Sequence, residues 1–118
     1  MPAAPTIYHN PKCGTSRKVL GMLTEAGQTP QVIEYLKTPP SRADLVALLG
    51  RLGMTPAQLL RRKESLCEEL GLNDPARTND EVIDAMLAHP ILMERPIVIT
   101  GKGARVCRPA ETVLELMG

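Results

Sequence analysis

Apolar positions in this sequence follow two different spacings near the N-terminus. Thr6–His9 and Gln31–Leu36 are short runs of β-prone residues, and each predicts a strand. Between them, Arg17–Ala26 carries apolar residues at helical spacing and is followed by Gly27, a helix-stop signal. A strand, a helix and a strand within about 30 residues predict a βαβ unit with parallel strands and a right-handed crossover.

The middle of the chain, about residues 41–89, predicts several helices in succession. Ser41 with Asp44, and Thr78 with Glu81, have the three-residue spacing of helix N-terminal capping pairs. Pro56 suits the first position of another helix. We therefore expect a block of helices between the first and last strands.

The last third returns to strand spacing. Ile97–Thr100 is a β-branched run, and a Gly-Lys-Gly turn joins it to a return strand at Ala104–Cys107, which predicts a hairpin. Arg108-Pro109 would open a final helix that carries the apolar residues Val113, Leu114 and Met117. The whole order predicts one α/β domain over residues 1–118, with a mixed four-stranded sheet (βαβ…ββα) and a helical insertion at about residues 41–89.

Composition excludes several classes of partner. The 118 residues carry 14 basic and 13 acidic side chains, a net charge of +1, which argues against nucleic acid or an anionic membrane as a partner. The sequence shows no candidate membrane span. The three cysteines, Cys13, Cys67 and Cys107, are an odd number without metal-ligand spacing. We expect no metal site, and we expect the reducing cytoplasm as location.

Cys13 is the candidate for reactive chemistry. It lies between the first predicted strand and the first predicted helix, where unpaired backbone N–H groups and the helix dipole favour a negative charge. Both effects favour the reactive thiolate, and the same N–H groups can bind an anion. The alternative is a small buried residue in a strand–helix loop.

The element order is that of a thioredoxin-like fold with a helical insertion, and the chain resembles the glutaredoxin-coupled arsenate reductase family. The resemblance covers nearly the whole chain and rests on a set of short motifs. These motifs are His9-Asn10-Pro11-Lys12-Cys13-Gly14-Thr15-Ser16-Arg17, Tyr35-Leu36, Pro39-Pro40-Ser41-Arg42, Leu59-Leu60-Arg61, His89-Pro90-Ile91-Leu92, Arg95-Pro96-Ile97-Val98 and Cys107-Arg108-Pro109. Because the chain ends at Gly118, whereas the best-studied members run on, it also resembles shorter members of the superfamily.

The resemblance implies an enzyme of arsenic detoxification that reduces arsenate to arsenite without a bound cofactor. Cys13 would be the nucleophile that forms a thiol–arsenate adduct. Arg61, Arg95 and Arg108 would bind the oxyanion, and arginine suits this role because its planar fork matches oxyanion geometry. Position 16 is Ser where a Cys-x-x-Cys motif would supply a second thiol. The resemblance therefore implies glutathione, and then glutaredoxin, as external co-substrates.

The resemblance and the residues near Cys13 suggest supporting roles. His9 could stabilise the thiolate or could simply make a local hydrogen bond at the strand end. Ser16 and Arg17 could add donors near the sulfur. Thioredoxin-like folds place a cis-proline opposite the active cysteine, so the resemblance implies a cis Arg95–Pro96 bond.

Three alternatives remain open from the residues. Arg62, adjacent to Arg61, competes for the same role, and Cys107 could act as an internal second thiol. The chain could also be a thiol-redox or transcription-associated binding protein on the same fold, without arsenate turnover. Such a protein would not need the arginine set together with Cys13.

Overall fold

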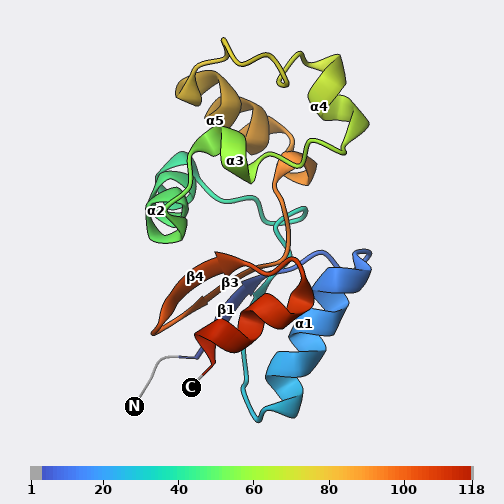
Figure 1. The fold of residues 1–118 in the computed structure, drawn as a ribbon, viewed down its shortest axis with the longest axis vertical. Helices are drawn as coiled ribbons and strands as arrows, with labels where there is room; N and C mark the ends of the chain where they lie inside the picture. The colour runs from blue at the N-terminus through green and yellow to red at the C-terminus, as the bar shows by residue number, and fades with distance from the viewer. Residues whose placement is uncertain (1–3, 118) are drawn as a thin grey trace. The chain divides into compact units, whose positions relative to one another are not determined.

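The helices and strands follow the order predicted from the sequence (Figure 1). The computed structural model describes residues 4–117, so residues 1–3 and Gly118 lie outside the described part. The elements are β1 (Thr6–Tyr8), α1 (Gly14–Glu25), β2 (Gln31–Ile33), α2 (Arg42–Leu52), α3 (Pro56–Leu59), α4 (Ser65–Glu69), α5 (Asn79–Ala88), η1 (Pro90–Leu92), β3 (Ile97–Thr100), β4 (Gly103–Val106) and η2 (Ala110–Leu116).

The chain divides into two compact units. The sheet unit comprises Met1–Thr38 and Arg95–Gly118, and the helical unit comprises Pro39–Glu94. The helical unit therefore extends a few residues beyond the insertion predicted at about residues 41–89. Both ends of the sheet unit contribute strands, so its sheet forms only when distant parts of the chain meet.

The sheet has four strands in the order β2-β1-β3-β4. β1 pairs with β2 in parallel and with β3 antiparallel, and β3 and β4 form the predicted hairpin. The prediction of a mixed four-stranded sheet is confirmed. β2 is shorter than expected because the chain turns after Ile33, where the Lys37 N–H donates to the Glu34 carbonyl at 2.9 Å.

The core of the sheet unit lies between the sheet and two helices. α1 and η2 run side by side (Figure 1) and bury an entirely small and aliphatic set of side chains. This core consists of Ile7, Val19, Leu23, Val98, Cys107, Ala110, Val113 and Leu116. The packing anchors α1 by one face, which holds its N-terminal end, and with it Cys13, against the sheet.

The last helix differs from the prediction in its hydrogen-bond type. η2 is a 3₁₀ helix, which has three residues per turn, so residues three apart share a face. Ala110, Val113 and Leu116 follow this spacing and are buried, whereas Leu114 is 57% exposed. Of the apolar residues expected on the final helix, Val113 is therefore in the core and Leu114 is on the solvent side.

The helical unit forms from local signals that are visible in the sequence. The Ser41 hydroxyl accepts a hydrogen bond from the Asp44 N–H at 3.1 Å, and Gly53 ends α2 with a φ of 65°. Thr78 and Glu81 make both hydrogen bonds of a capping box at the start of α5. The predicted caps are therefore confirmed. Among residues 4–117, no helix is long and apolar enough to cross a membrane.

Two leucines in η2 test the 3₁₀ spacing. We expect Leu116→Ala, at a 3% exposed position, to destabilise the protein by about 2–5 kcal/mol, because it leaves a cavity in the core. Leu114→Ala at the exposed position should cost less than about 0.5 kcal/mol. Urea unfolding of the two variants measures the difference. Equal losses of stability would contradict the burial pattern of η2.

Candidate active site

Cys13 is the N-terminal capping residue of α1, at the end of the loop that follows β1. Its backbone is extended, with φ −93° and ψ 120°, and its carbonyl accepts the first hydrogen bond of the helix, from the Arg17 N–H at 3.0 Å. The Cys13 N–H donates to the Asn10 carbonyl at 3.0 Å. The half-buried thiol thus lies where the helix N-terminus offers unpaired N–H groups.

Hydrogen bonds fix the loop before Cys13. The Ser16 hydroxyl is fully buried, accepts from the Asn10 N–H at 3.0 Å and lies 2.6 Å from His9 Nδ1. The Asn10 side-chain oxygen accepts from the Lys12 N–H at 3.0 Å. The loop therefore has a defined backbone path from β1 into α1.

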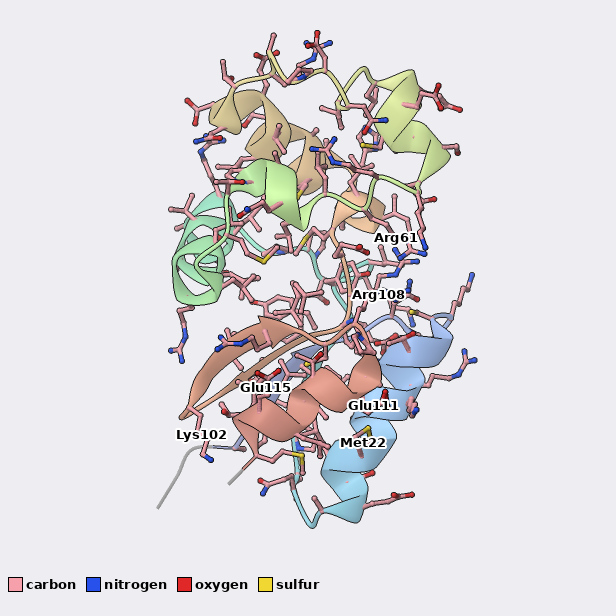
Figure 2. The ribbon with its side chains drawn as sticks, in the orientation of Figure 1. Met22, Arg61, Lys102, Arg108, Glu111 and Glu115 are labelled. Atoms are coloured by element: carbon pink, nitrogen blue, oxygen red, sulfur yellow. The ribbon has the colours of Figure 1, made fainter. Side chains whose placement is uncertain are left out.

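Two of the predicted arginines lie at the sulfur. Arg108 Nη1 is 3.6 Å from Cys13 Sγ and also donates to the Arg95 carbonyl at 3.2 Å. The Arg95 side chain, in a residue only 8% exposed, also donates to the sulfur. Figure 2 shows Arg108 at the N-terminal end of α1. Arg95 immediately precedes Pro96 and β3, and Arg108 precedes η2, so the folding of the sheet unit brings both residues to Cys13.

These neighbours determine the charge on Cys13. Burial alone would raise the pKa of the thiol, because it penalises the thiolate. The Ser16 N–H and the Arg95 and Arg108 guanidinium groups bind the thiolate, and together they hold the pKa of Cys13 below its ordinary value. The site therefore combines a thiol whose pKa is lowered with two cations.

The other cysteines have the opposite environment. Cys67 and Cys107 are both fully buried, and burial raises the pKa of each thiol, that of Cys107 to about 12. Cys107 packs in the core between the sheet, α1 and η2. Both therefore remain protonated at neutral pH, and the burial of Cys107 offers no support for an internal second thiol.

His9 and Arg17 make hydrogen bonds within the Cys13 loop and the first turn of α1. Burial lowers the pKa of His9, so the imidazole is neutral at neutral pH, and its hydrogen bond goes to Ser16. Arg17 Nη1 donates to the Pro11 carbonyl at 2.8 Å and bridges the loop from the exposed side. The structure thus brings Ser16, Arg95 and Arg108 to the Cys13 sulfur. His9 is hydrogen-bonded to the Ser16 hydroxyl.

Arg61 belongs to the helical unit, where two carboxylates hold it. Its Nη1 is 3.1 Å from Glu94 Oε1, and its Nε is 3.7 Å from Glu64 Oε2. Its backbone N–H donates to the Leu92 carbonyl at 2.7 Å. Neither carboxylate partner was predicted from the sequence. The i,i+3 spacing of Arg61 and Glu64 is visible there, but the contact with Glu94, 33 residues away, is not. A role for Arg61 in oxyanion binding remains a prediction.

The rival Arg62 has other partners in the same unit. Its Nη1 donates to Asn73 Oδ1 at 3.0 Å, and its Nη2 donates to the Ala57 carbonyl at 3.5 Å. Its guanidinium therefore braces the loop after α4 against α3.

In the part of the chain from residue 4 to residue 117, two peptide bonds before proline are cis. The Arg95–Pro96 bond has the isomer that the resemblance implied, and the Arg108–Pro109 bond is also cis, which was not predicted. Within residues 4–117, no group of three or more His, Cys, Asp or Glu side chains is placed to hold a metal ion.

A parallel β1-α1-β2 unit, an antiparallel β3-β4 hairpin and a cysteine at the start of α1 define a thioredoxin-like protein. Residues 8–116 match the ArsC family, and this chain belongs to that family. An arsenate reductase from Rhizobium meliloti (strain 1021) is 54% identical over 112 residues, which cover 95% of this chain and 80% of the relative. One from Escherichia coli (strain K12) is 52% identical, with 95% of this chain and 79% of the relative covered.

A solved structure agrees with these sequence matches. The arsenate reductase from Vibrio cholerae has a TM-score of 0.92 and 45% identity, and the match covers 97% of this chain and 98% of that chain. The resemblance inferred from the sequence motifs and the thioredoxin-like fold are thus both confirmed.

The contacts of Cys13 predict how its reactivity depends on pH and on anions. Iodoacetamide alkylation of the wild-type protein should show a Cys13 pKa below that of free cysteine, with the thiolate and its reactivity lost as the pH falls through that pKa. Sulfate should raise this pKa and slow alkylation, because a bound anion repels the thiolate.

Cys13→Ser is the control for this measurement, since Cys67 and Cys107 are buried and protonated. A pKa at or above the free-cysteine value of about 8.5, unmoved by sulfate, would contradict a preformed anion site around Cys13.

Proposed function

We propose that this chain reduces arsenate to arsenite, with Cys13 as the nucleophile and with electrons from external thiols. The observation that carries the proposal is the contact of Cys13 Sγ with Arg108 at 3.6 Å, together with the Arg95 hydrogen bond, at the start of α1. This arrangement supplies a thiolate and cations for an oxyanion in one place. The arsenate reductases at about half identity over most of the chain support the same reaction.

Arsenate at neutral pH is a tetrahedral anion, and its capture needs several donors in different directions. Arg95 and Arg108 would each offer a planar fork of N–H groups, and the first turn of α1 would add backbone N–H groups. We propose Arg61 as the third cation. Since Glu94 and Glu64 pair with Arg61, an oxyanion would have to compete with these carboxylates for the guanidinium.

The reaction begins with attack of the Cys13 thiolate on arsenic. A sulfur–arsenic bond forms, and one arsenate oxygen takes up protons and leaves as water. An external thiolate then attacks the Cys13 sulfur, and the electron pair of the sulfur–arsenic bond passes to arsenic, which leaves as arsenite. Two thiols are thereby oxidised to one mixed disulfide while arsenic gains two electrons.

The second thiol must come from outside the chain. Position 16 is a serine, and both remaining cysteines are buried and protonated. Glutathione would form the mixed disulfide with Cys13, and glutaredoxin would reduce it and return the thiolate. This supply of thiols fits the reducing cytoplasm.

Cysteine variants test the proposed chemistry in an assay that couples arsenate, glutathione and glutaredoxin to NADPH oxidation. Cys13→Ser should abolish arsenate reduction, because a hydroxyl is not ionised at neutral pH. Cys67→Ser and Cys107→Ser should retain most of the activity as long as the proteins fold.

A folded but inactive Cys107→Ser variant would move the mechanism to an internal disulfide relay. Full activity of Cys13→Ser, or wild-type protein that turns over no arsenate, would refute the proposal. Circular dichroism of each variant checks its fold.

Lysine variants test the arginines, because lysine keeps the charge and loses the fork. We expect three variants to raise the KM for arsenate by a larger factor than the factor by which they lower the acid dissociation constant of the Cys13 thiol. These variants are Arg95→Lys, Arg108→Lys and Arg61→Lys. Arg62→Lys is the matched control for Arg61, since Arg62 contacts Asn73 and Ala57 instead. If Arg62→Lys impairs arsenate use while Arg61→Lys does not, the two assignments are exchanged.

A further inference from the structure

Asn10 is a buried polar residue in an otherwise exposed loop. It is 3% exposed, whereas the next two residues, Pro11 and Lys12, are exposed. Burial of an amide is costly unless it is hydrogen-bonded, so its contacts indicate what the residue does. In the sequence it was visible only as part of an Asn-Pro turn signal.

Asn10 connects to both sides of the Cys13 loop through three hydrogen bonds. Its side-chain oxygen accepts from the Lys12 N–H at 3.0 Å, which forms an Asx turn. Its carbonyl accepts from the Cys13 N–H at 3.0 Å, and its N–H donates to the Ser16 hydroxyl at 3.0 Å. One residue therefore holds the backbone before Cys13, the backbone of Cys13 itself and the first turn of α1.

We propose that Asn10 is a positioning residue for Cys13, whose side-chain oxygen and main chain keep the sulfur aligned with the Ser16 N–H and with Arg108. This inference builds on the proposed role of Cys13 as the nucleophile. Asn10 itself does not touch the sulfur in any of these contacts; it acts through the path of the loop.

The physical argument concerns the direction of a hydrogen bond. The Ser16 N–H stabilises the thiolate only while it points at the sulfur, because hydrogen bonds weaken steeply with misalignment. Both groups are fixed relative to Asn10, Ser16 through its hydroxyl and Cys13 through its N–H. The Asx turn also fixes the backbone at Lys12. Removal of the Asn10 side-chain oxygen would therefore leave the exposed part of the loop without this hydrogen bond.

An amide suits this position better than other acceptors. A carboxylate could accept from Lys12 as well, but its charge would lie in the same loop as the thiolate and would oppose it. Serine offers a neutral acceptor that forms the same kind of turn more weakly. Alanine offers none.

The test measures the alkylation of Cys13 against pH in Asn10→Ala, Asn10→Ser and the wild type. In Asn10→Ala we expect the Cys13 pKa to rise by about one unit, which slows alkylation below the pKa about tenfold. Asn10→Ser should fall between Asn10→Ala and the wild type. Asn73→Ala is the matched control. The Asn73 side-chain oxygen accepts hydrogen bonds from Arg62 and Cys67, which both belong to the helical unit. Its Cys13 pKa should not change.

Thermal unfolding of the same variants separates positioning from general stability. An Asn10→Ala protein that loses stability but keeps the wild-type Cys13 pKa would overturn the proposal. So would a serine variant whose pKa is no better restored than that of the alanine variant. If Asn10→Ala does not fold, Asn10→Ser alone decides: an unchanged pKa overturns the proposal, and a raised pKa supports it.

This readout needs no arsenate, so the two proposals can fail separately. A wild-type protein with a low Cys13 pKa but no arsenate turnover would refute the proposed function. The role of Asn10 would still stand if Asn10→Ala raised that pKa.

Discussion

The site depends on the balance between burial and charge at one sulfur atom. Burial of Cys13 works against its thiolate, and a bare sulfur at this depth would remain a thiol. Three groups from separate parts of the chain reverse the balance, namely the Ser16 N–H, Arg95 and Arg108. The role of the sheet unit is to bring the start of α1 together with the residues before β3 and η2.

Arg108 is held in place by a second acceptor besides the sulfur. Its Nη1 also donates to the Arg95 carbonyl at 3.2 Å. In the proposed reaction the sulfur loses its negative charge when it bonds to arsenic, whereas a carbonyl acceptor stays as it is. The guanidinium therefore keeps one partner through each stage, and the oxyanion meets a cation already in place.

Local signals allowed much of the fold and part of the site to be predicted from the sequence. The capping pairs at Ser41 and Thr78 involve residues three apart, and the position of Cys13 depends on one strand–helix junction. The contacts that escaped prediction join distant residues, such as Arg61 with Glu94 across 33 positions. The 3₁₀ form of η2 also escaped, because Leu114 fits the apolar spacing of an α-helix as well as its neighbours do.

The backbone pairing in the helical unit has a consequence for chain length. The Arg61 N–H donates to the Leu92 carbonyl, the Glu94 N–H donates to the Leu59 carbonyl, and Leu60 pairs with Met93. Residues 62–91 thus lie between two segments, 59–61 and 92–94, that are hydrogen-bonded to each other. A change in the length of an exposed loop within this segment would leave Arg61 and Glu94 held at the same separation by these backbone hydrogen bonds. A single residue added between Met93 and Glu94 would instead move the Glu94 N–H out of register with the Leu59 carbonyl.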